Sequence, residues 1–342
     1  MDGARDMTGI HSDPEFQTLL RYSAHIGADA ALVQAAGGNV SLKRDGVLWV
    51  KASGTWLANA LTQDIMVPVQ LDALLAAMHA NEAENTAPFV VSALNSSGLR
   101  PSIETTLHGA LPHPVVVHVH CVETMAWAAR SDAPQVLAPL LAGLRWAFVP
   151  YVRPGAPLTR AVLDAAGPDT DVLILGNHGL VAGGADTAEA GALIAEVARR
   201  LRRSVRVAPP ADLAALERIS ADTDFTPAAD PHAHGTATDP AALDIALRGS
   251  LYPDHVIFLG PGIHTLPADR LPAGPAPMLV LPGLGVLLRR DASSGVAPLA
   301  RCLADVTARL DPLEPIVALT QAHEDELLGW DAEKYRQALN AR

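Results

Sequence analysis

Charged and aromatic residues are scarce in this 342-residue chain, and cysteine is nearly absent. Asp, Glu, Lys and Arg make up 18% of the residues, aromatic residues make up 4%, and the two cysteines are Cys121 and Cys302. Two cysteines cannot build a disulfide framework, which favours a reducing compartment and predicts a cytoplasmic protein. Because hydrophobic residues reach 49%, the composition excludes long disorder and predicts a sizeable core.

Positive charge is also in short supply, since the formal net charge is −12 at pH 7. This balance argues against nucleic acid as a partner, because nucleic-acid-binding proteins usually need a basic face. No uninterrupted apolar run reaches about 18 residues, so no membrane span is expected. Residues 1–16 place no apolar stretch after a basic start, so no signal peptide is expected either.

The chain divides into two α/β parts on the pattern of its apolar residues and prolines. Residues 1–208 alternate helical spacing with short strand-like runs, including a hairpin over 39–51. Residues 209–237 have a weak pattern and several prolines, which predicts a linker containing one short helix at 212–219. Residues 238–342 predict a smaller α/β domain. Its strands are expected at 256–259, 278–281 and 285–288, followed by a helix over 296–310.

The two parts share a faint internal repeat. Residues 173–181 resemble residues 279–287, and each segment is followed by an Asp and an Ala-rich helix. Residues 115–120 resemble residues 256–261, but the second segment lacks both histidines of the first. The second part is therefore either a degenerate copy without a metal site or an unrelated α/β unit.

Three histidines near the ends of apolar runs are the most informative residues. His118 and His120 close the run 114–120, whose four valines favour a buried strand. Side chains two apart on a strand share a face, so both imidazoles should project together. His178 follows a second apolar run at 171–175, where site residues of α/β proteins collect. Three imidazoles with one open position are typical of a catalytic zinc; ordinary hydrogen-bonded histidines are the alternative.

A carboxylate and two small polar loops accompany the histidines. Ser102 is a good N-cap, which places Glu104 in the first turn of the following helix, with His108 one turn later. Near a metal, Glu104 can be a ligand or a general base; otherwise it complements the helix dipole. The loops at 37–41 and 52–55 can bring backbone N–H groups to an anion, although ordinary turns have the same composition.

In order along the chain, these segments resemble the class II aldolase and adducin family, which includes L-fuculose-1-phosphate and L-rhamnulose-1-phosphate aldolases. The resemblance covers about residues 16–207. It rests on five segments: GNVS (38–41), KASGT (51–55), SIE (102–104), VHVH (117–120) and NHGL (177–180). The resemblance implies a three-layer α/β/α fold with a mainly antiparallel central sheet. It also implies a divalent metal, most often Zn²⁺ with Mn²⁺ or Co²⁺ as alternatives, and a homo-oligomer, commonly a tetramer.

The family's site residues transfer by position. The implied metal ligands are His118, His120 and His178, and Glu104 is the carboxylate that touches the resting metal and moves the substrate proton. The implied phosphate-binding residues are Asn39, Ser53, Gly54 and Ser102. The implied enzyme is a carbon–carbon lyase for a sugar or sugar phosphate. It would cleave a ketose, as the 1-phosphate, to dihydroxyacetone phosphate and an aldehyde through a metal-stabilised enediolate.

Two positions depart from the family pattern. Ile103 stands where fuculose-type aldolases carry a second serine, so phosphate binding can differ or the substrate can lack a phosphate. The family's tyrosine acid has no counterpart that aligns, although Tyr151 lies in a similar region. The general acid is therefore left unassigned.

The same metal site serves several reactions, which the motifs do not separate. The alternatives are a pentulose-phosphate 4-epimerase, a sugar-phosphate dehydratase and a decarboxylase. A non-catalytic, adducin-like interaction module is an alternative of another class, but such a module has no need of three histidine ligands. A nicotinamide-dependent dehydrogenase is disfavoured, because the glycines at 260–262 and 282–285 form no GxGxxG fingerprint at a strand–helix turn.

Overall fold

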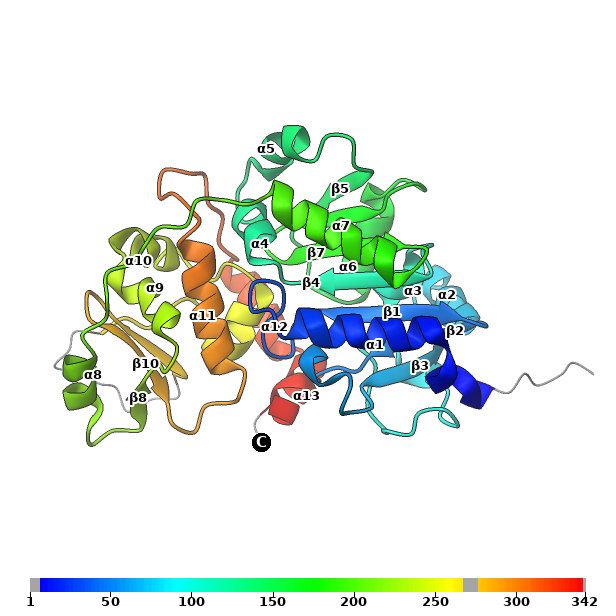
Figure 1. Ribbon diagram of the computed structural model, residues 1–342, viewed down its shortest axis with the longest axis horizontal. Helices are drawn as coiled ribbons and strands as arrows, with labels where there is room; N and C mark the ends of the chain where they lie inside the picture. Colours follow the sequence, from blue (N-terminus) through cyan, green and yellow to red (C-terminus); the bar gives the residue numbers. More distant parts are fainter. Residues whose placement is uncertain (1–6, 267–275, 341–342) are drawn as a thin grey trace, which may run out of the picture. The chain divides into compact units, whose positions relative to one another are not determined.

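The computed structural model describes residues 7–266 and 276–340 (Figure 1). The chain forms two compact units, and each is built from several stretches of sequence. The first unit contains the residues up to 119, 143–174 and 180–197. The second contains 120–142, 175–179 and the residues from 198 onward.

A seven-stranded sheet is the centre of the first unit, with strand order β3-β2-β1-β4-β7-β6-β5. The strands are β1 (Asn39–Arg44), β2 (Val47–Lys51), β3 (Met66–Gln70), β4 (Val115–Val119), β5 (Trp146–Val149), β6 (Val172–Leu175) and β7 (Gly179–Gly184). The pairs β1–β2, β1–β4, β2–β3 and β4–β7 are antiparallel. The predicted α/β fold with a mainly antiparallel sheet is therefore confirmed.

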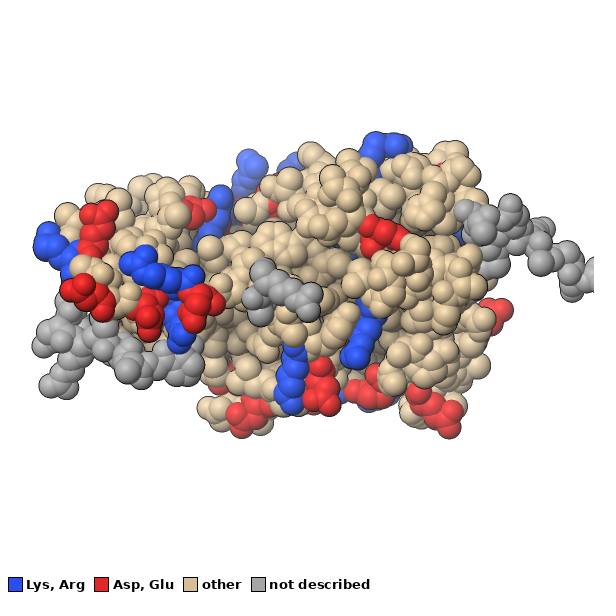
Figure 2. All heavy atoms as spheres, turned by 90° about the horizontal axis from the view of Figure 1, so that it is seen from below, with Lys and Arg blue, Asp and Glu red and all other residues tan. Residues whose placement is uncertain are grey.

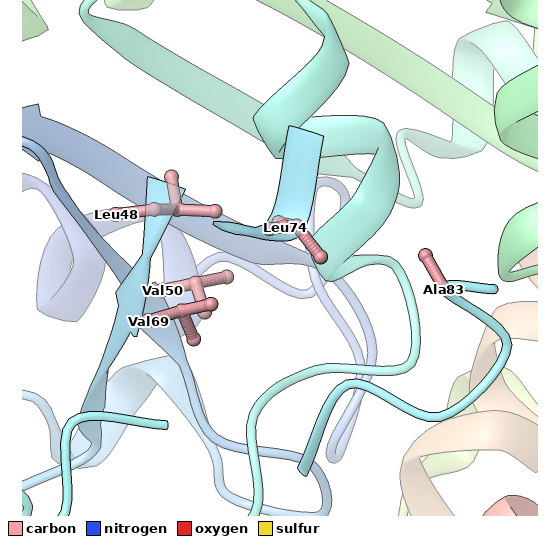
Figure 3. Packing of buried hydrophobic residues seen from close by; sticks show 5 residues of the cluster. All are labelled: Leu48, Val50, Val69, Leu74 and Ala83. Atoms are coloured by element: carbon pink, nitrogen blue, oxygen red, sulfur yellow. The ribbon is translucent and has the colours of Figure 1, made fainter. Parts of the chain in front are cut away.

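Helices cover both faces of this sheet, as the alternation along β2 shows. Trp49 packs edge-to-face against Phe16 of α1 (Pro14–Gly27), with ring centroids 5.6 Å apart. The opposite side of β2 contributes to a core cluster made of Leu48, Val50, Val69, Leu74 and Ala83 (Figure 3). This cluster includes a side chain of α2 (Leu71–His79), which packs on α3 (Thr105–Ala110). Successive side chains of a strand point to opposite faces, so α1 and the α2–α3 pair form the two outer layers.

The apolar residues of 13–35 recur at helical spacing, but α1 covers only part of this range. Asp13 caps α1 by accepting hydrogen bonds from the N–H groups of Glu15 and Phe16. The helix ends at Gly27, because the Asp29 side chain accepts the N–H of Ala31 and turns the chain away. The other helices that begin in this unit are η1 (Met7–Ser12), η2 (Leu57–Asn59), η3 (Ala87–Phe89), α6 (Ala156–Ala165) and α7 (Thr187–Arg200).

Two glycines beside β1 allow the local strain to be tested. Gly46 closes the predicted β1–β2 turn with φ +78°, and a Cβ added there meets nothing within 4 Å. Gly38 precedes β1 with φ +61°, and a Cβ there would lie 2.8 Å from the carbonyl oxygen of His118.

Gly46→Ala should lower the free energy of unfolding by about 1–2 kcal/mol from the left-handed backbone alone. Gly38→Ala should cost about 1–3 kcal/mol more, because the added methyl group is also overpacked. Urea denaturation of both variants measures this difference, and equal losses would contradict the clash.

The second unit contains a three-stranded antiparallel sheet with strand order β8-β10-β9. Its strands are β8 (Phe225–Pro227), β9 (Met278–Leu281) and β10 (Gly285–Arg289), so the strands expected at 278–281 and 285–288 are confirmed. Its helices are α4 (Val122–Ala128), α5 (Ala133–Leu140), α8 (Leu213–Ser220), η4 (Pro231–His234), α9 (Gly235–Thr238), α10 (Pro240–Ala246), η5 (His255–Leu259), α11 (Val296–Thr307), α12 (Gln321–Gly329) and α13 (Asp331–Asn340).

The strand predicted at 256–259 is wrong, because this buried segment forms the π-helix η5. A short apolar run does not distinguish a buried strand from a buried helix. Of the segments compared for an internal repeat, 115–120 and 256–261 therefore differ in structure. Residues 173–181 and 279–287 each form two neighbouring strands joined by a tight turn and followed by a helix. The domain division at residues 208 and 238 stays a prediction.

No helix within residues 7–266 and 276–340 is long and apolar enough to cross a membrane. On the face drawn in Figure 2, basic and acidic side chains occur in mixed groups, separated by uncharged surface. Among the described residues on that face, no broad basic patch is seen.

Candidate metal centre

The pairing of β1 with β4 places Asn39 directly opposite His118. Ser41, two residues further along β1, pairs with Val50 of β2. Side chains two apart on a strand share a face, so Asn39, Ser41 and His118 lie on the sheet face that carries the Val50 cluster. That face is covered by α3, and Glu104 lies immediately before this helix.

The start of α3 differs from the prediction and explains where Glu104 lies. Ser102 is not the N-cap, because its N–H donates to the carbonyl of Lys51 at 3.0 Å and so holds it beside β2. The helix begins at Thr105, and Glu104 is the N-cap residue without a capping hydrogen bond from its side chain. Its carboxylate oxygen Oε2 instead lies 3.4 Å from Nε2 of His118. Glu104 is therefore held by a contact with His118 and not by a capping hydrogen bond to the helix.

A chain of hydrogen bonds connects β1 and α3 to Glu104. Nδ2 of Asn39 donates to Oε2 of Glu104 at 2.8 Å, and Oδ1 of Asn39 contacts Nε2 of His108. Nδ1 of His108 lies 2.7 Å from the hydroxyl of Ser41. An amide oxygen only accepts, so His108 carries its proton on Nε2 and accepts from Ser41. The sequence pattern indicated an anion-binding loop at Ser41, whereas in the structure the Ser41 hydroxyl bonds to the ring of His108.

Burial fixes the charge state of His108. It lowers the pKa of His108 to about 3, although the neighbouring Glu104 carboxylate acts in the opposite direction. The ring is therefore neutral at physiological pH and holds Asn39 in a single amide orientation. In turn, Asn39 fixes the carboxylate of Glu104.

The hydrogen bonds of His118 leave one ring nitrogen suitable for a metal. Nδ1 lies 3.1 Å from the carbonyl oxygen of Leu180 on β7, so Nδ1 carries the proton. Nε2 then presents a lone pair at 3.4 Å from the Glu104 carboxylate. Two acceptor atoms at this separation repel each other unless a cation or a proton is close to both, and a metal at Nε2 meets that need.

His120 has the same arrangement in the second unit. Its Nδ1 lies 3.1 Å from Oδ2 of Asp254, and both side chains are buried. The Asp254 carboxylate accepts a hydrogen bond from Nδ1–H, so Nε2 carries the lone pair that a metal ligand needs. The ring of His178 lies beside that of His120, with centroids 5.4 Å apart. Asp254 had no signal in the sequence, since it is far from His120 along the chain.

His178 is held by the turn after β6. Asn177 adopts φ +48°, an uncommon backbone conformation for a residue other than glycine that Asn tolerates better than most. Its side-chain amide donates to the carbonyls of Leu251 at 3.0 Å and Val317 at 2.8 Å. These two bonds fix the turn and hence the direction of the His178 side chain.

Together, the three histidines meet the requirements of a metal site. His118, His120 and His178 are buried and offer nitrogen atoms that all lie within 4.8 Å of one another. Tetrahedral zinc with bonds of about 2.0–2.1 Å separates its nitrogen ligands by about 3.3 Å, which small side-chain rotations can reach. Among the described residues, no other group of three or more His, Cys, Asp or Glu side chains has ligand atoms close enough to hold one metal ion. Three nitrogen ligands on one cation would leave a coordination position for a substrate, as in catalytic rather than structural zinc sites.

The predicted phosphate-binding residues Asn39, Ser53 and Ser102 are connected through hydrogen bonds at the ends of β1 and β2. The N–H of Ser53 donates to the carbonyl of Arg100 at 2.9 Å, which pairs this loop with the segment before Ser102. The hydroxyl of Ser102 accepts from Nδ2 of Asn39 at 3.2 Å. The Ser53 hydroxyl is buried without a hydrogen-bond partner among the described residues, and the next residue, Gly54, has φ +78°. A buried hydroxyl without a partner is unusual and is explained if a ligand supplies the bond.

A buried lysine shapes the loop before β1. Nζ of Lys51 donates to the carbonyls of Ala36 and Gly38, both at 3.0 Å. These bonds satisfy carbonyl groups that turn inward and fix the backbone leading into Asn39. Lys51 therefore supports the site by holding its loop.

Comparison with known proteins identifies the family. The model described as the class II aldolase and adducin N-terminal domain matches residues 17–205, which is more than half of the chain. The chain belongs to the class II aldolase and adducin family.

Individual relatives match parts of the chain. A curated protein named uncharacterized oxidoreductase YuxG, from Bacillus subtilis (strain 168), is 30% identical in an alignment of 182 residues. The alignment covers 49% of this chain and 26% of the relative. The chain thus spans about a quarter of that relative's length. The N-terminal class II aldolase domain of a conserved protein from Thermoplasma acidophilum is 27% identical, with a TM-score of 0.48, over 59% of this chain and 95% of that one. L-fuculose-1-phosphate aldolase from Thermus thermophilus is 17% identical, with a TM-score of 0.36, over 54% of this chain and 91% of that one.

Proposed function

We propose that this chain is a metal-dependent lyase, a class II aldolase that cleaves a ketose, as its 1-phosphate, to dihydroxyacetone phosphate and an aldehyde. One observation carries the proposal. Three buried imidazoles present nitrogens within 4.8 Å of one another, and the Glu104 carboxylate lies 3.4 Å from the His118 ring. Burying polar rings together costs free energy unless they bind something, so an interaction module gives no reason for this arrangement.

The residues take complementary parts in the reaction. A divalent cation held by the three histidines, most simply Zn²⁺, would supply Lewis-acid stabilisation of negative charge on the substrate oxygens. Cleavage breaks the C3–C4 bond of the ketose and releases the proton of the C4 hydroxyl. The electron pair of the broken bond stays on the C3 fragment as an enediolate. Glu104, whose orientation is fixed by Asn39, delivers a proton to C3, and in the reverse direction removes it from dihydroxyacetone phosphate. The group that receives the hydroxyl proton is not assigned; Tyr151 follows β5.

The loops after β2 and before α3 are proposed to bind the phosphate. Ser53 and Ser102 offer hydroxyl donors, and Asn39 holds the Ser102 hydroxyl in place by donating to it from Nδ2. Gly54 has no side chain to hinder the approach of an anion to the backbone. Ile103 has no hydroxyl group at the position where fuculose-type enzymes have a serine. We therefore expect weaker phosphate binding than in those enzymes, not loss of the site.

The same centre also suits a pentulose-phosphate 4-epimerase, a sugar-phosphate dehydratase or a decarboxylase, because all of these stabilise a similar anion. The oxidoreductase activity in the name of the Bacillus relative is not carried over, since about three quarters of that relative lies outside the match. A homo-oligomer, with a tetramer favoured, stays a prediction.

Product analysis decides among these reactions. The zinc-loaded protein is incubated with ketose 1-phosphates, pentulose 5-phosphates, the matching free ketoses and hydroxy acids. We expect dihydroxyacetone phosphate and an aldehyde in equal amounts from at least one ketose 1-phosphate. Ser53→Ala should raise the KM for that substrate about tenfold, the usual cost of one hydrogen bond to a charged group. An epimer, a dehydrated sugar or carbon dioxide as the product would replace the aldolase assignment.

A further inference from the structure

We propose that Asp254, held by Arg336, is a positioning residue that fixes His120 as a metal ligand. The C-terminal segment of the chain would thereby complete the metal centre. This inference rests on the proposed metal-dependent function and adds residues that lie outside the family match, which ends at residue 205.

The second unit combines short stretches around His120 and His178 with the C-terminal segment. The stretches that carry His120 and His178, residues 120–142 and 175–179, cluster with the residues from 198 onward. Two of the three proposed ligands are thus packed with the C-terminal segment. The side chain of Asn177, beside His178, also bonds to two carbonyls of that segment.

The carboxylate of Asp254 contacts both His120 and Arg336. Its Oδ2 lies 3.1 Å from Nδ1 of His120. Nη1 of Arg336 donates to Oδ1 at 2.6 Å, and Nη2 donates to Oδ2 at 3.0 Å. Two parallel bonds from a planar guanidinium fix the plane of the carboxylate as well as its position. Phe258 lies against the same guanidinium, whose carbon is 5.3 Å from the ring centroid. The carboxylate therefore cannot turn away from His120 without breaking this pair.

The local backbone brings Asp254 to this place. It directly precedes the π-helix η5, which ends at Leu259 and is followed by Gly260 with φ +86°. A π-helix is rare and often occurs at functional sites, because its wider turn redirects neighbouring side chains. The guanidinium of Arg336 donates to both oxygens of Asp254 and supplies the positive charge that a buried carboxylate needs to stay ionised. Asp254 is consequently an ionised acceptor.

An ionised acceptor acts on the metal through the ring. It holds the proton on Nδ1 of His120, so that Nε2 carries the lone pair, and it makes the ring a stronger electron-pair donor to a cation. His118 receives the same tautomer from the neutral carbonyl of Leu180. The carboxylate is the stronger of the two partners, so its charge should matter for metal affinity.

The competing explanation is that Asp254 and Arg336 are only a buried ion pair that ties α13 to the segment before η5. Breaking such a pair destabilises a protein because one charge is left buried without its partner. Stability alone therefore does not separate the explanations, whereas zinc affinity does.

The experiment measures the zinc affinity of the full-length apoprotein by competition with a chromophoric chelator, together with its urea stability. Asp254→Asn keeps an acceptor oxygen and removes the charge. The double variant Asp254→Asn with Arg336→Gln removes the buried guanidinium together with its partner charge. The glutamine keeps an N–H donor for Glu333, whose Oε2 lies 3.5 Å from Nη1 of Arg336. The matched control is Asp239→Asn in the same unit, where Asp239 pairs with Arg206 at 2.8 Å and lies outside the histidine group.

We expect both Asp254 variants to bind zinc about 10–100-fold more weakly than the wild type, while Asp239→Asn stays near the wild-type value. Wild-type affinity in the double variant, or an equal loss in Asp239→Asn, would overturn the positioning role. If Asp254→Asn alone does not fold, the zinc affinity of the double variant decides whether Asp254 positions His120. Wild-type protein that binds zinc but cleaves no ketose phosphate would contradict the proposed reaction, and the variant affinities would still decide the role of Asp254.

Discussion

Replacing Glu104 by Gln should lower turnover of the ketose phosphate by about 10²–10⁴-fold while zinc remains bound, because a positioned general acid–base group contributes that much to a rate. The amide keeps the size of the side chain and can still accept the hydrogen bond from Asn39. It cannot carry a proton to or from the substrate. Turnover and zinc content are measured on the same preparation.

Proton exchange makes this prediction specific. In heavy water, wild-type protein should exchange the C3 proton of dihydroxyacetone phosphate, and Glu104→Gln should lose that exchange to the same degree as turnover. Glu15→Gln is the matched control, since Glu15 is partly buried and bonds to Thr187 away from the histidines. Exchange and turnover that survive in Glu104→Gln would exclude this carboxylate as the proton carrier.

His178→Ala should weaken zinc binding by more than about 100-fold, because removal of a direct ligand should cost more than loss of a group that only bonds to a ligand. Turnover should fall to background as the zinc is lost. The variant should still fold, since the backbone of the turn is held by the side chain of Asn177. Zinc affinity and circular dichroism on the apoprotein check both statements.

A control histidine separates loss of a ligand from loss of a buried ring. His234 is also buried in the second unit, where it bonds to the carbonyl of Ala228 and the N–H of Val286. His234→Gln should lower stability and leave zinc affinity unchanged. If His178→Ala retained one zinc per chain, His178 would not be a ligand.

The parts of this molecule that follow local rules could be predicted from the sequence. The β1–β2 hairpin follows from its Asp45–Gly46 turn, where both residues have positive φ. The buried strand over 115–119 follows from its valines. A period of two predicts His118 and His120 on one side, although the strand itself ends at Val119. The family segments then select His178 among the other histidines.

Features that depend on distant partners could not be predicted in this way. Serine is a residue type that often caps helices, which predicted Ser102 as the N-cap. Because the N–H of Ser102 bonds to the carbonyl of Lys51, the helix instead begins at Thr105. The run 256–259 reads equally well as a strand, and only its packing makes it a π-helix. Arg336 pairs with Asp254 across 82 positions of sequence, beyond the part that the family model matches, so no local spacing indicates the pair.

The central claim is that imidazoles of His118, His120 and His178 bind one divalent cation, and an anomalous diffraction map at the zinc absorption edge tests it most directly. The account predicts one peak per chain, about 2.0–2.1 Å from a nitrogen of each of the three rings. A map without a peak at these rings after zinc soaking, or a peak bonded to other side chains, would contradict it.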